Sequence, residues 1–372
     1  MSERLAAPVP RSIAIVGTGL IGASVGLAAR RAGASRVSGW DPDADVLEVA
    51  AGRDAIEPAR SLDDAVGAAE LVVVAAPVAV LPMTVRDVLD RAPAGCAVSD
   101  VGSTKATVCA AASGDGRFIG GHPICGAETR GPERANAELF DGATWFLTPT
   151  AATGPDRLRT LHSFVSALGA RPVAIDPTTH DRLVGVTSHL PHALANVLLN
   201  QAGASRIDGH DPLHAAGGSL RDMSRIAGAN PRIWVDIFLD NRDALGAALA
   251  EHRRRIEELE AALANRDAGY LARWIAEAGG NRRRLLGTAY EDVGALQQLR
   301  VHVPDRPGVL AEIFQALGAE RINVEDFEME HLSTERGGVL TVLVAGEEEA
   351  ARAASLLESQ GYSAIVAPVI ED

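Results

Sequence analysis

The glycine-rich turn Gly17-Thr18-Gly19-Leu20-Ile21-Gly22 constrains the fold of this chain more than any other feature. It follows a compact apolar run at residues 12–16 and precedes a predicted helix that extends to about residue 32. In such a turn the first glycine permits a sharp bend, the second lets a pyrophosphate approach the backbone, and the third lets the helix pack on the strand. The turn therefore predicts the first strand-turn-helix unit of a dinucleotide-binding fold, with a glycine-rich turn that binds no ligand as the alternative.

An acidic residue farther along indicates which dinucleotide binds. Asp41 lies 19 residues beyond Gly22, at the end of a second predicted strand at 36–40. A carboxylate at this place accepts hydrogen bonds from the ribose hydroxyls and repels a 2′-phosphate. Positions 42–45 carry no arginine that could bind such a phosphate. The sequence therefore favours NAD over NADP as the cofactor.

The order of predicted elements begins with an α/β domain at residues 10–176. Short apolar strands alternate there with helices, which is typical of a doubly wound, Rossmann-type sheet with parallel strands. The predicted strands are 12–16, 36–40, 71–76, 97–100, 118–121, 145–149 and 172–175. Predicted helices follow the second, fourth and sixth of these strands, at 46–50, 104–112 and 156–168.

Two further domains follow. From residue 178 strand signals disappear, and Asn230-Pro231, an N-cap residue before a proline, predicts the start of a long helix with apolar residues at helical spacing. We expect an all-helical substrate and dimerisation domain at 177–290, whose apolar stripes pack within the chain and against a second copy in a homodimer. Residues 296–372 have the pattern βαββαβ, which predicts a ferredoxin-like domain.

Charge and cysteine content exclude several classes of partner. The net charge of −14 argues against binding to nucleic acid or to anionic membranes. The uncharged run at 12–29 has the length of a membrane anchor, but its four glycines favour a strand-turn-helix.

Three cysteines, at positions 96, 109 and 125, are an odd number without metal-site spacing, which favours a reducing, cytoplasmic location.

Polar strings downstream of the turn are candidates for chemistry. His122 stands in Gly120-Gly121-His122-Pro123, where a predicted strand ends, and ligands of doubly wound sheets bind outside those strand ends. Asp100 to Lys105 follows the preceding strand, and the string Ser188-His189-Leu190-Pro191-His192 lies in the helical domain. His189 and His192 could be a core polar pair or half a metal site, but no carboxylate or cysteine cluster completes a set of ligands, so we expect no metal. A histidine after a strand could also simply cap a turn.

Together these strings resemble one family. GTGLIG, SDVGSTK, GGHPICGAE, SHLPHA, a Gly-Gly pair followed by RDMSRIA, and IWVDIF occur in the order typical of prephenate dehydrogenases of tyrosine biosynthesis, over residues 12–286. The segment LRVHVPDRPGVLAEIFQAL resembles an ACT domain, a regulatory module that typically binds amino acids. The resemblance implies NAD-dependent oxidative decarboxylation of prephenate to 4-hydroxyphenylpyruvate.

The resemblance also implies residue roles. His122 would take the proton of the ring hydroxyl, and Ser103 would hold that hydroxyl and orient the histidine. Arg225 would bind a carboxylate of the dianionic substrate, for which its guanidinium offers a bidentate fork. The other implied substrate-binding residues are His192, Trp234, Gly218 and Glu128, the last as a gate. Pro77 would join the glycine-rich turn and Asp41 in binding the cofactor.

In the ACT-like segment, the start of the first helix is the expected effector site, and the pathway implies L-tyrosine as a feedback inhibitor. The candidate regulatory residues are Asp305, Gly308, Val309, Leu310 and Asn323. A dimerisation module without a ligand is the alternative for this segment. For the whole chain the alternatives are arogenate as the substrate, a β-hydroxyacid or imine dehydrogenase on a similar scaffold, and a non-catalytic sensor of NAD and amino acids.

Overall fold

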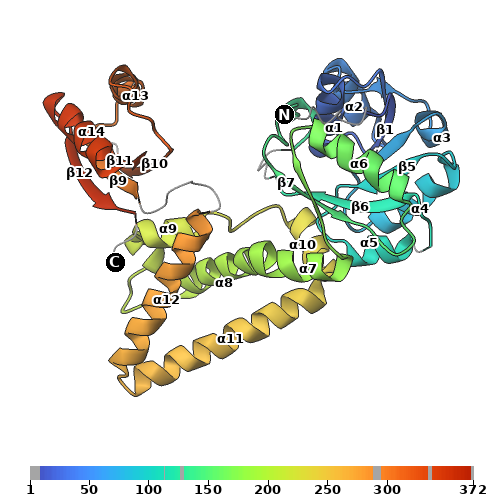
Figure 1. Cartoon of the computed structure of the whole chain (residues 1–372). Coiled ribbons are helices and arrows are strands. Elements are labelled where there is room, and N and C mark those ends of the chain that lie inside the picture. Colours follow the sequence, from blue (N-terminus) through green and yellow to red (C-terminus); the bar gives the residue numbers. More distant parts are fainter. Residues whose placement is uncertain (1–8, 113, 126–129, 288–294, 334–336, 370–372) are drawn as a thin grey trace. The chain divides into compact units, whose positions relative to one another are not determined.

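The computed structural model describes residues 9–112, 114–125, 130–287, 295–333 and 337–369 (Figure 1). The chain divides into two compact units, Met1–Arg253 and Arg254–Asp372. The first unit contains an α/β domain and a set of helices that follows it, and the second contains a small α/β domain.

The α/β domain of the first unit is built on one eight-stranded sheet in the order β3-β2-β1-β4-β5-β6-β7-β8. Its strands are β1 (Ser12–Val16), β2 (Arg36–Trp40), β3 (Glu57–Pro58), β4 (Leu71–Val74), β5 (Ala97–Asp100), β6 (Phe118–Pro123), β7 (Thr144–Thr148) and β8 (Arg171–Ala174). The strand order reverses between β1 and β4, which is the topological switch point of a doubly wound sheet. The sequence-based fold class is confirmed.

Helices cover both faces of this sheet (Figure 1). Alternate residues of β1 point to opposite faces, so Ile13 and Ile15 belong to one buried cluster and Ala14 and Val16 to another. The first cluster includes α1 (Leu20–Arg31), α2 (Ala44–Gly52) and α6 (Pro155–Ala167). The second includes α3 (Leu62–Val66), α4 (Leu81–Arg91) and α5 (Ala106–Ala111), of which α3 and α4 were not predicted.

The expectation of parallel strands throughout is wrong at one edge. β7 pairs with β6 in the antiparallel sense, and β8 runs parallel to β7. A parallel pair needs a crossover connection, usually through an α-helix. Within its described residues, the β6–β7 connection contains only the short 3₁₀ helix η1 (Pro132–Arg134), so the chain returns in the opposite direction. The pairing places His122 opposite Phe146, inside β6 rather than in a turn after it.

The helical part of the first unit begins at α7 (Pro177–Val184), whose N-cap Asp176 accepts a hydrogen bond from the backbone N–H of Thr179 at 2.9 Å. A π-helical turn, η2 (Gly185–His189), joins α7 to α8 (Leu190–Ala204). The elements that follow are η3 (Pro212–Ala215), α9 (Gly218–Ser224), α10 (Pro231–Asp240) and α11 (Arg242–Ala264), of which α11 continues past Arg253 into the second unit. Asn230 caps α10 as predicted, with its side chain accepting from the backbone N–H of Arg232.

The long helix expected after Pro231 is interrupted at Asn241, between α10 and α11. Asn241 is 4% exposed and has φ −101° and ψ 27°, which is not helical. Its side-chain Nδ2 donates to the carbonyl of Asp181 at 2.8 Å and lies 3.0 Å from Nδ1 of His189. The apolar periodicity continues through this break, so the sequence pattern did not reveal it.

In the second unit, α12 (Ala268–Leu286) precedes the small α/β domain, whose sheet has the order β10-β11-β9-β12. The domain contains β9 (Leu296–Val303), α13 (Val309–Ala319), β10 (Asp326–Ser333), β11 (Gly337–Ala345), α14 (Glu347–Ser359) and β12 (Ser363–Pro368). The predicted βαββαβ order is confirmed, and all the pairings in this sheet are antiparallel. Among the described helices, none combines the length and the apolar character of a membrane span.

Candidate active site

The glycine-rich turn between β1 and α1 is shaped by two close approaches within the protein. Gly17 has φ +91°, and a Cβ there would lie 2.5 Å from the carbonyl oxygen of Ala75. A Cβ on Gly22 would lie 1.9 Å from the carbonyl oxygen of Gly17. Both positions therefore require glycine for the fold itself, as the sequence pattern predicted.

The fold itself does not require glycine at position 19. A Cβ at Gly19 would meet no protein atom within 4 Å, and its φ of −64° is open to other residues. Gly19 is the N-cap of α1, where no side chain caps the helix and no acidic residue occupies the first turn. The bare backbone at a positive helix end leaves room for a phosphate group, so the turn fits a dinucleotide.

Asp41 lies beside this turn, at the end of β2. Its Oδ2 accepts a hydrogen bond from the backbone N–H of Thr18 at 2.7 Å, and its Oδ1 accepts from the backbone N–H of Asp43 at 2.9 Å. These two bonds hold the carboxylate at the edge of the turn.

The other candidate residues from the sheet lie at the same edge. Pro77, Ser103 and His122 come from the carboxyl ends of β4, β5 and β6, which run parallel to β1 and β2. Leu20 and Ile21 form the start of α1 at this edge. The fold thus brings the predicted cofactor turn and the predicted base to one edge of the sheet.

A buried ion pair connects the ends of β5 and β6. Nζ of Lys105 contacts Oδ2 of Asp100, and both side chains are 0% exposed. The same Nζ donates to the carbonyl of Gly121 at 2.8 Å, while Oδ1 of Asp100 accepts from the N–H of Gly121 at 3.0 Å. The backbone immediately before His122 is therefore fixed on both sides.

The ring of His122 is held by a residue that sequence reasoning missed. Nδ1 of His122 lies 2.9 Å from Nε2 of His180, and Nδ1 of His180 lies 2.8 Å from Oδ1 of Asp181. His180 and Asp181 lie on α7 and are 0% and 5% exposed. Within the described residues, no hydrogen bond joins Ser103 to His122, so the orienting role of Ser103 stays a prediction.

Burial is the main reason that His122 stays neutral. Desolvation, followed by the nearby His180, Lys105 and His189, holds the pKa of His122 well below its usual value of 6.5. A neutral imidazole can accept a proton, which is the state that a base requires near pH 7.

His189 and His192 take different positions on either side of Pro191. His189 is 2% exposed and bonded to Asn241, and burial lowers its pKa to about 4. No group of three or more possible metal ligands occurs in the described part of the chain.

His192 and Trp234 form an aromatic wall, with ring centroids 3.6 Å apart and planes inclined by 29°. The Nδ1 atom of His192 is buried and has no hydrogen-bond partner among the described residues. Gly218 begins α9, and Arg225 follows its last residue with its side chain exposed. Glu128 lies outside the described residues.

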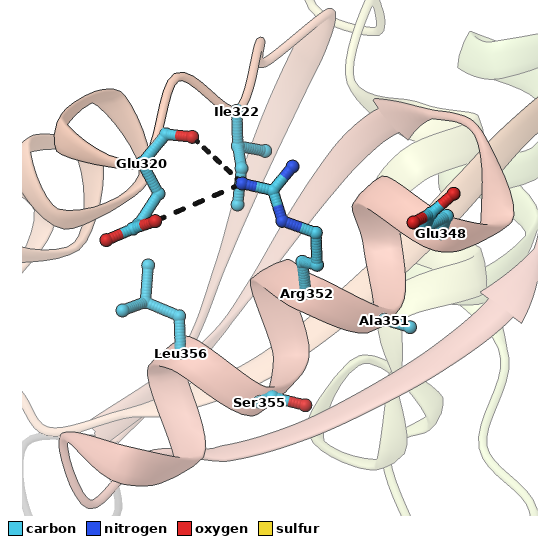
Figure 2. Close-up of a pocket in the computed structure, with 7 residues that line it drawn as sticks. All are labelled: Glu320, Ile322, Glu348, Ala351, Arg352, Ser355 and Leu356. Carbon is cyan, nitrogen blue, oxygen red and sulfur yellow. Dashed lines mark hydrogen bonds and ion pairs between the residues drawn. The ribbon is translucent and has the colours of Figure 1, made fainter.

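The predicted effector residues surround the start of α13 in the second unit. Gly308 has φ +89° and caps this helix, Val309 is buried, Asp305 and Asn323 are exposed, and Leu310 is half-buried. Arg306 in the same loop donates to Oε2 of Glu312 at 2.5 Å. A cavity of about 430 Å³ lies elsewhere in this domain, where Arg352 of α14 donates to the carbonyl of Glu320 (Figure 2). None of the five predicted effector residues lines it.

The fold and the site together define a dinucleotide-binding oxidoreductase with a histidine at the cofactor edge of its sheet. The chain is 30% identical over 361 residues to prephenate dehydrogenase of Bacillus subtilis, an alignment that covers 94% of this chain and 96% of that protein. The chain belongs to the prephenate dehydrogenase family. The family models that match are "Prephenate dehydrogenase, nucleotide-binding domain" at 25–174, "Prephenate dehydrogenase, dimerization domain" at 176–277 and "ACT domain" at 297–361.

Two solved structures share the fold over about three quarters of this chain. Prephenate dehydrogenase of Aquifex aeolicus, in complex with hydroxyphenyl propionate and NAD+, is 27% identical, with a TM-score of 0.69 over 74% of this chain and 98% of that one. Arogenate dehydrogenase of Synechocystis is 28% identical, with a TM-score of 0.67 over 74% of this chain and 99% of that one. Family membership decides against a β-hydroxyacid or imine dehydrogenase.

Proposed function

We propose that this chain catalyses the NAD-dependent oxidative decarboxylation of prephenate to 4-hydroxyphenylpyruvate. The observation that carries the proposal is the neutral, hydrogen-bonded His122 at the same sheet edge as the glycine-rich turn. A base at this place can reach a substrate that lies against a nicotinamide ring.

The cofactor-binding residues would be the turn from Gly17 to Gly22, Asp41 and Pro77. The open space at Gly19 would admit the pyrophosphate, and the fixed carboxylate of Asp41 would accept the ribose hydroxyls. NAD, when bound, supplies the hydride acceptor. The carboxylate of Asp41 also supports NAD over NADP, because it would repel a 2′-phosphate.

His122 would first accept a proton from the substrate and later return it to the product. As the ring carbon that bears the hydroxyl loses its hydride, His122 takes the hydroxyl proton. The ring carboxylate then leaves as CO2, its bonding electrons enter the ring, and the ring becomes aromatic. The phenolate oxygen regains the proton from His122, so the product is a phenol and the base returns to its neutral form.

The helical part of the first unit would hold the substrate. Prephenate is a dianion, and Arg225 offers a bidentate fork for one carboxylate. The unpartnered Nδ1 of His192 and the face of Trp234 support a role in binding the side arm and shaping the pocket. Ser103, on the loop after β5, would hold the ring hydroxyl, and Gly218 and Glu128 complete the proposed set.

The similarity to Synechocystis arogenate dehydrogenase keeps arogenate as the second candidate substrate. The deciding experiment is a steady-state assay of prephenate and arogenate, each with NAD and with NADP. We expect NADH formation with prephenate and NAD to have the highest kcat/KM of the four combinations. A higher kcat/KM with arogenate would reassign the substrate, and no turnover with either would favour the sensor.

Replacing His122 by asparagine tests the base. We expect kcat to fall roughly 10²–10⁴-fold because general-base catalysis is lost, while the Kd for NAD changes little. Steady-state kinetics and a fluorescence titration with NADH measure the two effects. Near-wild-type turnover would show that His122 is not the base.

We further propose that the protein is a cytoplasmic homodimer inhibited by L-tyrosine through its ACT domain. The match to a dimerisation domain, the ACT match and three cysteines present as thiols support these three points. Isothermal titration with tyrosine, phenylalanine and tryptophan tests the effector. We expect heat only with tyrosine, and an Asp305→Ala variant should weaken that binding. No binding of any of the three would leave the domain as a structural module.

A further inference from the structure

The hydrogen bonds around His122 determine which of its nitrogens carries a proton. The chain of contacts runs from Nδ1 of His122 to Nε2 of His180 at 2.9 Å, and from Nδ1 of His180 to Asp181 at 2.8 Å. His180 is 0% exposed, so solvent does not compete for these contacts.

Asp181 determines which atom is the donor in each hydrogen bond between His122, His180 and Asp181. Its Oδ1 accepts from the backbone N–H of Lys105 at 2.7 Å, and its Oδ2 accepts from the backbone N–H of Ala106 at 2.8 Å. Both oxygens are therefore acceptors, and Nδ1 of His180 must donate its proton to Asp181. Nε2 of a neutral His180 is then an acceptor, so Nδ1 of His122 carries a proton and donates it. The remaining nitrogen of His122, Nε2, has the free lone pair.

We propose that His180 and Asp181 are positioning residues that hold His122 in the tautomer with Nε2 as the basic atom and stabilise the imidazolium that forms during the reaction. This inference rests on the proposed role of His122 as the base. When His122 takes a proton, its Nδ1–H bond to His180 becomes charge-assisted and therefore stronger. The carboxylate of Asp181, on the far side of His180, then offsets part of the charge, by the same logic that relates an aspartate to the histidine of a catalytic triad.

Burial makes this compensation necessary, because it is the largest cause that disfavours the protonated form of His122. The groups that act on His122 from neighbouring elements are His180 on α7, Lys105 before α5 and His189 on η2, and each adds to this effect when it carries a positive charge. Lys105 is itself paired with Asp100 and bonded to the carbonyl of Gly121. The same loop thus fixes both the backbone before His122 and the carboxylate that directs its ring.

A matched pair of substitutions separates the hydrogen bonds from packing. His180→Gln can still accept from His122 with its amide oxygen and donate to Asp181 with its amide nitrogen. His180→Leu fills similar space but removes both bonds. We expect His180→Leu to lower kcat about 10–100-fold, as the loss of an orienting partner does at other sites, with the KM values for prephenate and NAD within about threefold of wild type. His180→Gln should restore most of the lost kcat. Equal kcat values for the two variants, whether high or low, would overturn the proposal.

The tautomer can be observed directly, without turnover. Long-range ¹H–¹⁵N spectra of the full-length protein distinguish a ring protonated at Nδ1 from one protonated at Nε2, and the His122→Asn variant identifies the signal. We expect the proton on Nδ1 in the wild type and a mixture of tautomers in His180→Leu. A wild-type proton on Nε2 would overturn the proposal even if the leucine variant does not fold. The substrate assay and His122→Asn kinetics test the proposed function separately, since the tautomer is read from the resting protein.

Discussion

At the scale of single residues, burial decides which side chains of the site can carry charge. Desolvation is the largest cause of the lowered pKa of both His122 and His189. Lys105 and Asp100 are equally buried, but each has the other as a partner. The site therefore combines neutral histidines with one compensated ion pair, and both arrangements have consequences for stability.

The buried histidines predict a loss of stability at acid pH. The unfolded chain protonates its histidines near pH 6.5, whereas the folded chain resists protonation of His189 down to about pH 4. The unfolded state thus binds more protons between these values, and the free energy of unfolding falls as pH drops from 6.5 to 4. Denaturant unfolding at several pH values measures the slope. His189→Asn should make it shallower, and a slope equal to wild type would contradict the assignment.

The ion pair predicts a large effect of Lys105→Met. Removing the lysine leaves the carboxylate of Asp100 buried without its partner, so we expect a loss of about 3–5 kcal/mol in the free energy of unfolding. Urea denaturation monitored by circular dichroism measures this loss. In the control, Asp100→Asn combined with Lys105→Met removes the unpaired charge and should recover part of the stability. A loss below about 1 kcal/mol in the single variant would show that the pair contributes little.

At the scale of elements, the β1–α1 turn separates glycines needed for folding from a glycine available to a ligand. Gly19→Ala should change the free energy of unfolding by less than about 1 kcal/mol, because a Cβ there meets no protein atom within 4 Å. The same Cβ would occupy the phosphate-binding space and weaken NAD binding at least about tenfold, or about 1.4 kcal/mol. Fluorescence titration with NADH measures the affinity.

Gly22→Ala serves as the comparison for Gly19→Ala. Its Cβ would lie 1.9 Å from the carbonyl oxygen of Gly17, so this variant should lose stability before any ligand is added. Unchanged NAD affinity in Gly19→Ala would remove the main structural support for the proposed cofactor site.

Elements were predicted well where the signal is local and missed where tertiary contacts override it. The bounds of β1, β2 and β5 agree with the sequence-based strands. The break at Asn241 was missed because its cause is distant in the chain. The side chain of Asn241 hydrogen-bonds to Asp181 and His189, which lie 60 and 52 positions away. The reversal of β7 was missed because strand direction depends on the connection, which apolar patterning does not report.

At the scale of the whole molecule, the helices of the first unit present apolar side chains to the surface. Ile233, Val235 and Leu239 on α10 are 49%, 51% and 62% exposed. They lie within the range that matches the dimerisation domain of the family. Such surface is costly in an isolated chain, and a second copy would cover it.

A glutamate at Leu239 should therefore weaken the dimer. We expect light scattering on a sizing column to give about twice the chain mass of 38.8 kDa for the wild type. Leu239→Glu should move the population toward the monomer at micromolar concentration, because a buried charge opposes association. Met83→Glu on α4, where the side chain is 66% exposed, is the matched control and should stay dimeric. Identical masses for the two variants would exclude α10 from the interface.

The sequence by itself determined the features that depend on local stereochemistry and residue spacing. These are the glycine turn, the acidic residue after the second strand, the alternation of strands and helices, and the histidine at a strand end. Only the tertiary structure decided how that histidine is held. His122 and His180 stand 58 positions apart, and a hydrogen bond between them exists only because β6 and α7 pack together. Which nitrogen of the base is free follows from this packing, because a tautomer is set by its neighbours in space.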